Sequence, residues 1–144
     1  MGTLSLNAAS SGSTTLTPTN NITATVTLPG ATTTLVGNSV VQTFSASQRG
    51  TVTTDNDLSF DMNVTNNFKC TPTATGALTF TNITAGQSGY VLLVNSGGYA
   101  ITAAATTKVG ATFLSTVSAA GTYLISYFSP DGTSVYCTAS GALS

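Results

Sequence analysis

The chain has 144 residues and a formal net charge of −1, and charged side chains make up 5% of it, against about 25% in typical soluble domains. Three Lys or Arg residues are too few to hold a phosphate backbone, which argues against a nucleic-acid partner. Without His and Glu there is no Ser-His-Asp triad, no Cys-His dyad and no usual zinc ligand set, so we predict no enzyme activity, metal or cofactor.

The polar part of the chain comes from Thr and Ser, which together supply about a third of the residues. Thr is β-branched and favours strands, whereas Glu, Lys and Arg, which usually fill the wet faces of helices, are absent or rare. This composition predicts an all-β chain. A surface with so little charge is poorly protected against self-association, and a partner can bury it without desolvating ions. We therefore expect the protein to work in an assembly.

Residues 1–20 are small and polar and predict an N-terminal arm. Two interpretations stay open, a flexible terminus and an arm that orders on a partner surface. Leu4, Leu6 and Leu16 would give such an arm apolar grip and are candidate interface residues. No basic region followed by an apolar run predicts a signal peptide, and no stretch has the roughly 20 apolar residues that span a bilayer. We expect no membrane partner.

Three strands are predicted next, each bounded by turn residues. Residues 22–28 alternate apolar side chains with Thr, which is the period of a half-buried strand. Residues 32–36 and 39–45 form two further runs, separated by a Gly-Asn dipeptide that indicates a hairpin. Arg49 follows in a Gln-Arg-Gly turn. A surface turn explains it, but arginine is enriched at interface hot spots, so it is also a candidate interface residue.

The longest alternation covers residues 57–70, with a break at Asn66 that predicts a bulge or bend. The apolar residues of this run are Leu58, Phe60, Met62, Val64, Phe68 and Cys70. Asp55, Asp57 and Asp61 lie close in sequence and offer oxygen ligands that suit calcium. They lack the Gly and the closing Glu of the calcium loop. We interpret them as a turn and the wet face of a strand, and predict no metal site.

The second half of the chain holds further strand signals. Residues 77–82 predict a strand, and residues 90–95 (YVLLVN) form a continuous apolar run, typical of a strand buried on both faces. Residues 99–102 follow a Gly-rich turn and predict another strand, with Tyr99 as the last candidate interface residue. Residues 103–120 fit either a short helix or two weak strands.

Residues 122–128 and 133–139 predict a β-hairpin across a Pro-Asp-Gly turn. With the earlier runs, about eight to ten short strands follow one another at regular spacing, a pattern typical of a sandwich, barrel or jelly roll. We predict one all-β domain over residues 21–144, a β-sandwich or jelly roll of antiparallel strands. Cys70 and Cys137 are expected to be reduced, half-buried thiols.

Three segments carry a family resemblance: NFKCTPTATGALTFTNI (67–83), GQSGYVLLVN (86–95) and GTYLISYFSPDGTSVYCTASGAL (121–143). With the residues between them, they make the chain from Val40 onward resemble virion structural proteins of tailed phages, especially marine and cyanobacterial ones. In such phages the module occurs both as a small capsid decoration (cement) protein and as the end of a longer tail fibre. Cement proteins of this type are commonly trimeric jelly rolls seated on the capsid shell.

The resemblance implies a non-enzymatic capsid decoration protein that is made in the host cytoplasm, forms a homotrimer and binds the major capsid protein on the virion surface. The sequence has no repeats or coiled coil of the kind that precede a fibre tip, which favours the cement protein over the fibre. The alternative is a receptor- or saccharide-binding module of a tail fibre, whose exposed Tyr and Asn side chains would make the contacts. The resemblance carries over no catalytic residues and no cofactor.

Overall fold

The computed structural model of the chain describes residues 47–144. The arm over residues 1–20 and the strands predicted over residues 22–45 lie outside the described residues, so the domain boundary near residue 20 stays a prediction. The described elements, in chain order, are β1 (Val52–Thr54), β2 (Ser59–Asp61), β3 (Asn67–Cys70), β4 (Gly76–Thr81), β5 (Ser88–Asn95), β6 (Ile101–Ala103), β7 (Thr107–Val109), α1 (Phe113–Ser118), β8 (Gly121–Phe128) and β9 (Val135–Ala139).

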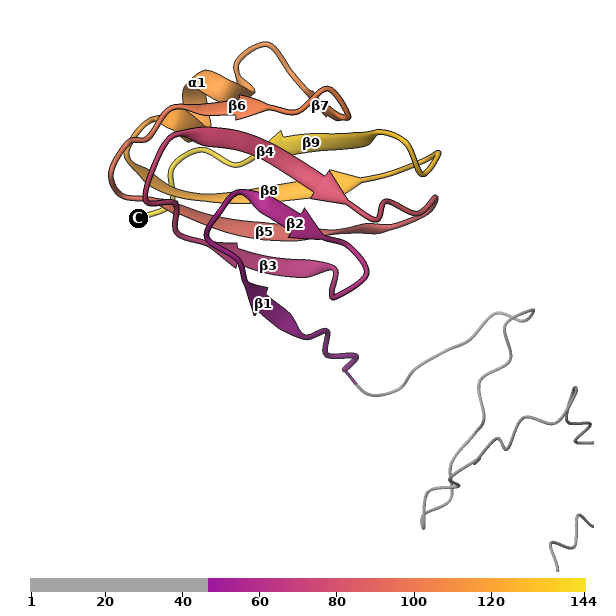
Figure 1. Cartoon of the computed structure of the whole chain (residues 1–144). Coiled ribbons are helices and arrows are strands. Elements are labelled where there is room, and N and C mark those ends of the chain that lie inside the picture. The colour runs from indigo at the N-terminus through magenta and orange to yellow at the C-terminus, as the bar shows by residue number, and fades with distance from the viewer. Residues whose placement is uncertain (1–46) are drawn as a thin grey trace, which may run out of the picture. The chain divides into compact units, whose positions relative to one another are not determined.

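The strands form two sheets that face each other (Figure 1). One sheet has six strands in the order β1-β3-β5-β8-β9-β7, and the other has three in the order β2-β4-β6. From β1 to β6 the chain alternates between the sheets, so each strand lies parallel to the one two places before it. The chain therefore coils around a shared core before the antiparallel pairs β5–β8 and β8–β9 extend the larger sheet.

The prediction of an all-β chain is confirmed, but antiparallel pairing is wrong for most of the described residues. Five of the seven strand pairs there are parallel. The physical reason is the path of the chain, because only β8 and β9 are joined by a hairpin within one sheet. A strand with one buried face has the same side-chain period in either kind of ladder, so the alternation in the sequence could not distinguish them.

Side chains from the inner faces of both sheets form one core. The ring centroids of Phe60 in β2 and Phe68 in β3 lie 5.0 Å apart, and those of Phe80 in β4 and Tyr127 in β8 lie 4.8 Å apart. Both pairs join one sheet to the other. Further buried members of the core are Leu78, Val91, Leu93, Ile125 and Val135. Burying each aliphatic or aromatic side chain of this size contributes about 1.5–3 kcal/mol to folding.

The ambiguous segment over residues 103–120 contains both a strand, β7, and a short helix, α1. Helix α1 packs against β6, β9 and β5 and buries Phe113 and Val117. It therefore continues the layer of the three-stranded sheet and covers the core beside β6 (Figure 1). The larger sheet needs this cover because it has more strands than the sheet that faces it.

The run over residues 57–70 is not one strand with a bulge but two strands, β2 and β3, in different sheets. Asp61 ends β2, since its carboxylate accepts a 2.9 Å hydrogen bond from the Asn63 N–H and its carbonyl a 3.1 Å bond from the Val64 N–H. The expected apolar residues are buried except Val64, which is exposed. Because both sheets face one core, the alternation resumes after Asn66 with the same side-chain period on the other sheet.

The hairpin between β8 and β9 is confirmed. Gly132 has a φ of 73°, the left-handed conformation that the sequence predicts there. The Ser129 hydroxyl oxygen accepts a 3.1 Å bond from the Gly132 N–H, and the Asp131 carboxylate accepts 2.8 Å bonds from the N–H groups of Thr133 and Ser134. These backbone donors, Ser134 first, hold the pKa of Asp131 below its ordinary value.

Asn95, at the end of β5, is a fully buried polar residue whose bonds tie three segments together. Its side-chain amide donates 2.9 Å hydrogen bonds to the carbonyls of Tyr99 and Val117, and its oxygen accepts a 2.9 Å bond from the Tyr99 N–H. The turn after β5 and the end of α1 are thereby fixed to the larger sheet. Buried polar groups are costly when unpaired, so this residue is needed for the local geometry.

Candidate interaction surface

The outer face of the six-stranded sheet carries large apolar side chains that water reaches. Successive side chains of a strand point to opposite faces, and in β5 and β8 apolar residues occupy both faces. Tyr90 is 54% exposed, Leu124 is 40% exposed and Phe128 is 47% exposed. We call the following set the outer apolar face: Val52, Tyr90, Leu92, Leu124, Phe128 and Tyr136.

Strand register brings these side chains together. Leu92 in β5 pairs with Leu124 in β8, and Phe128 in β8 pairs with Tyr136 in β9. Asn67 in β3 pairs with Val52 on one side and with Tyr90 on the other. Directly paired residues have Cβ atoms about 4.5–5.5 Å apart on the same face of a sheet. The outer apolar face therefore covers the neighbouring strands β5, β8 and β9, and Val52 in β1 adds to it across the polar outward positions of β3.

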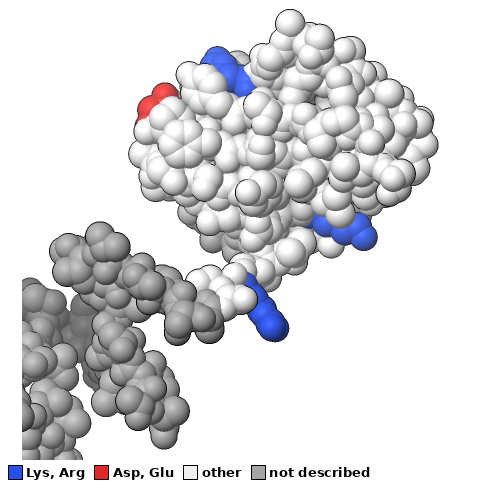
Figure 2. All heavy atoms as spheres, turned by 180° about the vertical axis from the view of Figure 1, so that it is seen from behind, with Lys and Arg blue, Asp and Glu red and all other residues white. Residues whose placement is uncertain are grey.

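Charged side chains are rare on this surface. Among the strands of the six-stranded sheet, as far as the chain is described, only Lys69 and Lys108 are charged. The Lys108 ammonium donates a 2.6 Å hydrogen bond to the Ala105 carbonyl. Figure 2 shows this side of the domain with charged side chains near its margins and an uncharged surface between them. A partner that covers this face meets one ion near its apolar centre, the ammonium of Lys69, whose residue pairs with Leu92.

A groove of about 390 Å³ lies at the β1 side of the outer apolar face. Its lining residues are Val52, Asn67, Phe68, Lys69, Tyr90, Leu92 and Leu124. The lining is mainly apolar, with the amide of Asn67 and the ammonium of Lys69 as its polar groups. Such a groove can accept an apolar or aromatic side chain from a partner, the kind of contact that anchors protein interfaces.

The outer face of the three-stranded sheet has a different composition. Its side chains include Ser59 in β2, Ala77, Thr79 and Thr81 in β4, and Thr102 in β6. No large apolar side chain is exposed on these three strands. The Thr79 hydroxyl donates a 3.1 Å hydrogen bond to the Ala77 carbonyl. This face satisfies its own polar groups and suits contact with water.

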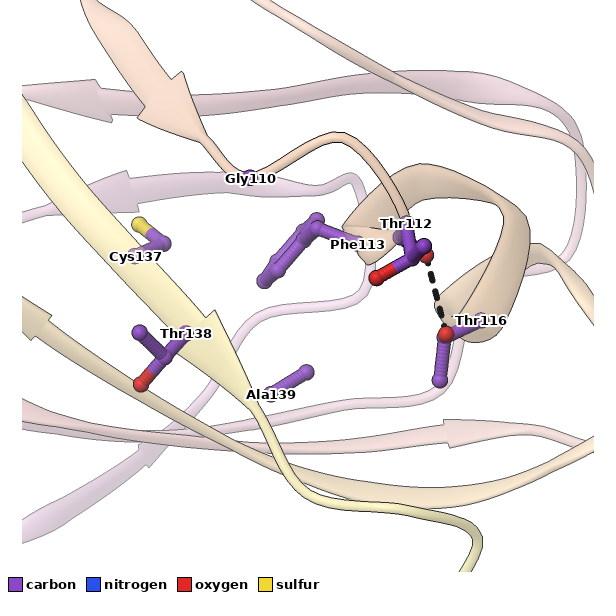
Figure 3. A pocket seen from close by; sticks show the side chains of 7 residues that line it. All are labelled: Gly110, Thr112, Phe113, Thr116, Cys137, Thr138 and Ala139. Carbon is purple, nitrogen blue, oxygen red and sulfur yellow. Dashed lines mark hydrogen bonds between the residues drawn. The ribbon is translucent and has the colours of Figure 1, made fainter.

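A second, smaller cavity lies between α1 and β9 (Figure 3). It has a volume of about 200 Å³, below the roughly 300–1,000 Å³ of typical ligand sites. The ring of Phe113 and the thiol of Cys137 line it beside the hydroxyl of Thr116, which donates a 2.9 Å bond to the Thr112 carbonyl. Burial raises the pKa of the Cys137 thiol to about 12. A thiol held neutral in this way is a poor nucleophile.

The other cysteine, Cys70, is also a free buried thiol, and burial raises its pKa to about 11. Both cysteines are thus reduced, as predicted, but they are more deeply buried than expected. They lie on β3 and β9, which are separated by β5 and β8. Three strand spacings amount to about 14 Å, well beyond the reach of a disulfide.

The acidic residues beside β2 bond to the local backbone. Asp57 accepts a 2.8 Å bond from the Ser59 N–H, and Asp61 accepts a 2.8 Å bond from the Asn82 side-chain amide. The amide of Asn82 and the N–H of Asn63 lower the pKa of Asp61, whereas burial and then the neighbouring Asp57 raise that of Asp55. Within residues 47–144, no group of three or more His, Cys, Asp or Glu side chains is placed to hold a metal ion.

Two of the predicted interface residues, Arg49 and Tyr99, lie among the described residues, and neither belongs to the outer apolar face. Leu4, Leu6 and Leu16 lie outside the described residues. Arg49 is exposed in the segment before β1. Tyr99 is half-buried, and its ring lies so close to Gly97 that a Cβ there would come within 2.4 Å of it. Tyr99 therefore packs against its own turn.

The sequence did contain a signal for the outer apolar face. The runs YVLLVN in β5 and YLISYF in β8 are apolar at nearly every position, which fits a strand covered on both sides. In the structure only one side of each strand faces the core. Within residues 47–144 the outward positions of β5 are exposed or half-buried, so the prediction that residues 90–95 are buried on both faces is wrong for this part of the chain.

No helix among the described residues has both the length and the apolar character needed to cross a membrane. Comparison with protein-family models, with curated proteins and with solved structures finds no match to this chain.

Proposed function

We propose that this chain is a non-enzymatic structural subunit of a tailed-phage particle, a capsid decoration protein that binds the outside of the head. Two independent features support this. The segments that resemble phage virion proteins form β3–β5, β8 and β9. The single observation that carries the proposal is the outer apolar face, a large and mainly apolar surface on a domain whose described residues already form a buried core. Surfaces of this kind are typical of protein interaction sites.

The proposed mechanism is burial of surface between subunits. Apolar area removed from water contributes roughly 25 cal/mol per Å², so neighbouring contacts add up around a shell. Copies that bridge shell proteins would resist the outward pressure of packed DNA. In this proposal the subunit is a homotrimer that contacts the major capsid protein. The two packed sheets support a β-sandwich, whereas the parallel pairs depart from the antiparallel topology of the jelly roll that the resemblance implies.

Immunogold labelling of intact virions with an antibody to the chain tests this proposal. Gold distributed over the head is the expected result. Gold confined to the tail would reject decoration and favour a fibre component. Virions without any gold, from a preparation in which the antibody detects the purified chain, would contradict a particle role altogether.

The second candidate is a saccharide- or receptor-binding module, which exposed aromatic rings on the outer apolar face favour. Tyr90 and Tyr136 are both more than half exposed, and such rings can stack on sugars. A glycan-array signal that is lost with Tyr90→Ala, while the variant keeps its unfolding midpoint, would support this candidate over decoration.

A further inference from the structure

We infer that the outer apolar face is the surface through which copies of this chain bind one another. The inference rests on the proposed role as an assembly subunit and deepens it, because it names the contact surface and the partner. It follows from three properties of that face: its extent, its apolar centre, and its contrast with the opposite side of the domain.

The extent suits a contact between proteins. The outer apolar face has members on β1, β5, β8 and β9, and the two longest of these strands, β5 and β8, have eight residues each. With β3 included, the strands from β1 to β9 hold 28 residues, and at about 4.8 Å between strands and 3.3 Å per residue this gives a plan area of roughly 440 Å². Because side chains project from the sheet, its accessible surface is larger than this plan area and approaches the approximately 800 Å² that each partner buries in a standard interface.

The distribution of polar groups favours a second copy over other partners. The Leu92–Leu124 pair at the centre offers no hydrogen bond, and few polar side chains lie among the aromatic rings: Asn67 and Ser126 pair with Tyr90, and the Ser126 hydroxyl already bonds that of Thr138 at 2.8 Å. Glycan recognition needs more polar groups than these. An acidic partner would find only Lys69, whose residue pairs with Leu92, and Lys108 on the far strand β7. A second copy presents the same mainly apolar surface. Interfaces between identical subunits are more apolar at their centre than other interfaces.

Sedimentation equilibrium of the purified full chain over a wide concentration range tests the inference. We expect reversible association of the wild type. Leu124→Lys, which places like charges at the centre of the contact, should weaken association at least about tenfold. Ala77→Lys adds the same charge to the outer face of the three-stranded sheet and should associate like the wild type. Unfolding curves confirm that each variant is folded.

Tyr90→Ser provides a second test if Leu124→Lys does not fold, because more than half of the Tyr90 side chain is already in water. It should also weaken association.

A wild type that stays monomeric at every concentration, or variants of the outer apolar face that associate as the wild type does, would overturn the inference. A monomer that instead binds a glycan or purified shells through Leu124 would show that a different partner covers the face. None of these results depends on the immunogold experiment, so the inference and the proposed function can fail separately.

Discussion

The two outer faces of this domain differ in their side chains although both sheets follow the same strand alternation. On the three-stranded sheet the outward positions hold small residues such as Ser59, Thr79 and Thr102. On the six-stranded sheet the outward positions of β5 and β8 include Tyr90, Leu92 and Leu124. Thr fills the wet face of a strand well, and the chain has it in abundance. The fold therefore does not require the apolar side chains at the outward positions of the larger sheet.

This difference shows where to look for function in a protein with few charges. Because the chain has few ionic groups, clusters of charged side chains do not mark a functional site. The informative observation is then a large exposed apolar surface. The inner faces hold the domain together and the outer face of the small sheet meets water, whereas the outer apolar face is the surface that we propose for a partner. Substitutions of the same kind on different faces test this division.

The largest difference is expected between two phenylalanines. Phe60 on the inner face of β2 is fully buried, whereas Phe128 on the outer face of β8 is 47% exposed. Phe60→Ala should lower the free energy of unfolding by about 3–5 kcal/mol, because it leaves a cavity between the sheets. Phe128→Ala should lower it by less than about 1 kcal/mol. Urea unfolding of dilute protein measures both, and equal losses would contradict the assignment of faces.

A smaller difference is expected between two polar residues of the larger sheet. Asn95→Ala removes bonds to Tyr99 and Val117 and leaves their buried backbone groups unpaired. We expect a loss of about 2–3 kcal/mol. Thr138→Ala on the outer face removes only the exposed hydroxyl contact with Ser126, for a loss below about 0.5 kcal/mol. If the two variants unfold at the same urea concentration, the role given to Asn95 is wrong.

The smallest expected effect is a dependence on alkaline pH that comes from the inner faces alone. Burial holds the thiol pKa values of Cys70 and Cys137 at about 11 and about 12, above the ordinary value of 9.0. Between these values the unfolded chain releases protons that the folded chain retains. The contribution of these thiols to the free energy of unfolding should therefore be constant below pH 9 and fall as the pH rises above it. Burial also raises the pKa of Tyr127 to about 12, so this side chain adds to the alkaline fall. Cys137→Ala should make this fall shallower, and an unchanged slope would contradict the burial of the thiol.

Local features of the fold could be predicted from the sequence. The alternation over residues 77–82, the continuous run over residues 90–95 and the Pro-Asp-Gly hairpin all correspond to described strands or turns. What the pattern could not give is which strands are neighbours. The turn after Asp61 moves the chain to the other sheet, and the apolar period shows this only as one break, at Asn66. Both sheets face one core, so parallel coiling and an antiparallel sandwich leave the same alternation in the sequence.

The candidate surface was harder to predict, for a different reason. The interface candidates Arg49 and Tyr99 were chosen by residue type, and neither belongs to the outer apolar face. The apolar run in β5 was read as a sign of burial within the domain. Periodicity indicates that a strand is apolar on both sides, but it does not tell whether the second side is covered by the same chain or by another.

Chemical labelling of single introduced cysteines tests the contact surface most directly. Leu124→Cys places a thiol on the outer apolar face, and Ala77→Cys places one on the opposite outer face. The wild type, whose native thiols are buried, gives the slow background rate of labelling. Reaction with a maleimide is followed at increasing protein concentration. We predict that the Leu124→Cys thiol becomes protected as the concentration rises and that the Ala77→Cys thiol stays reactive. Equal reactivity of both thiols at every concentration, or protection of Ala77→Cys alone, would contradict a contact through the outer apolar face.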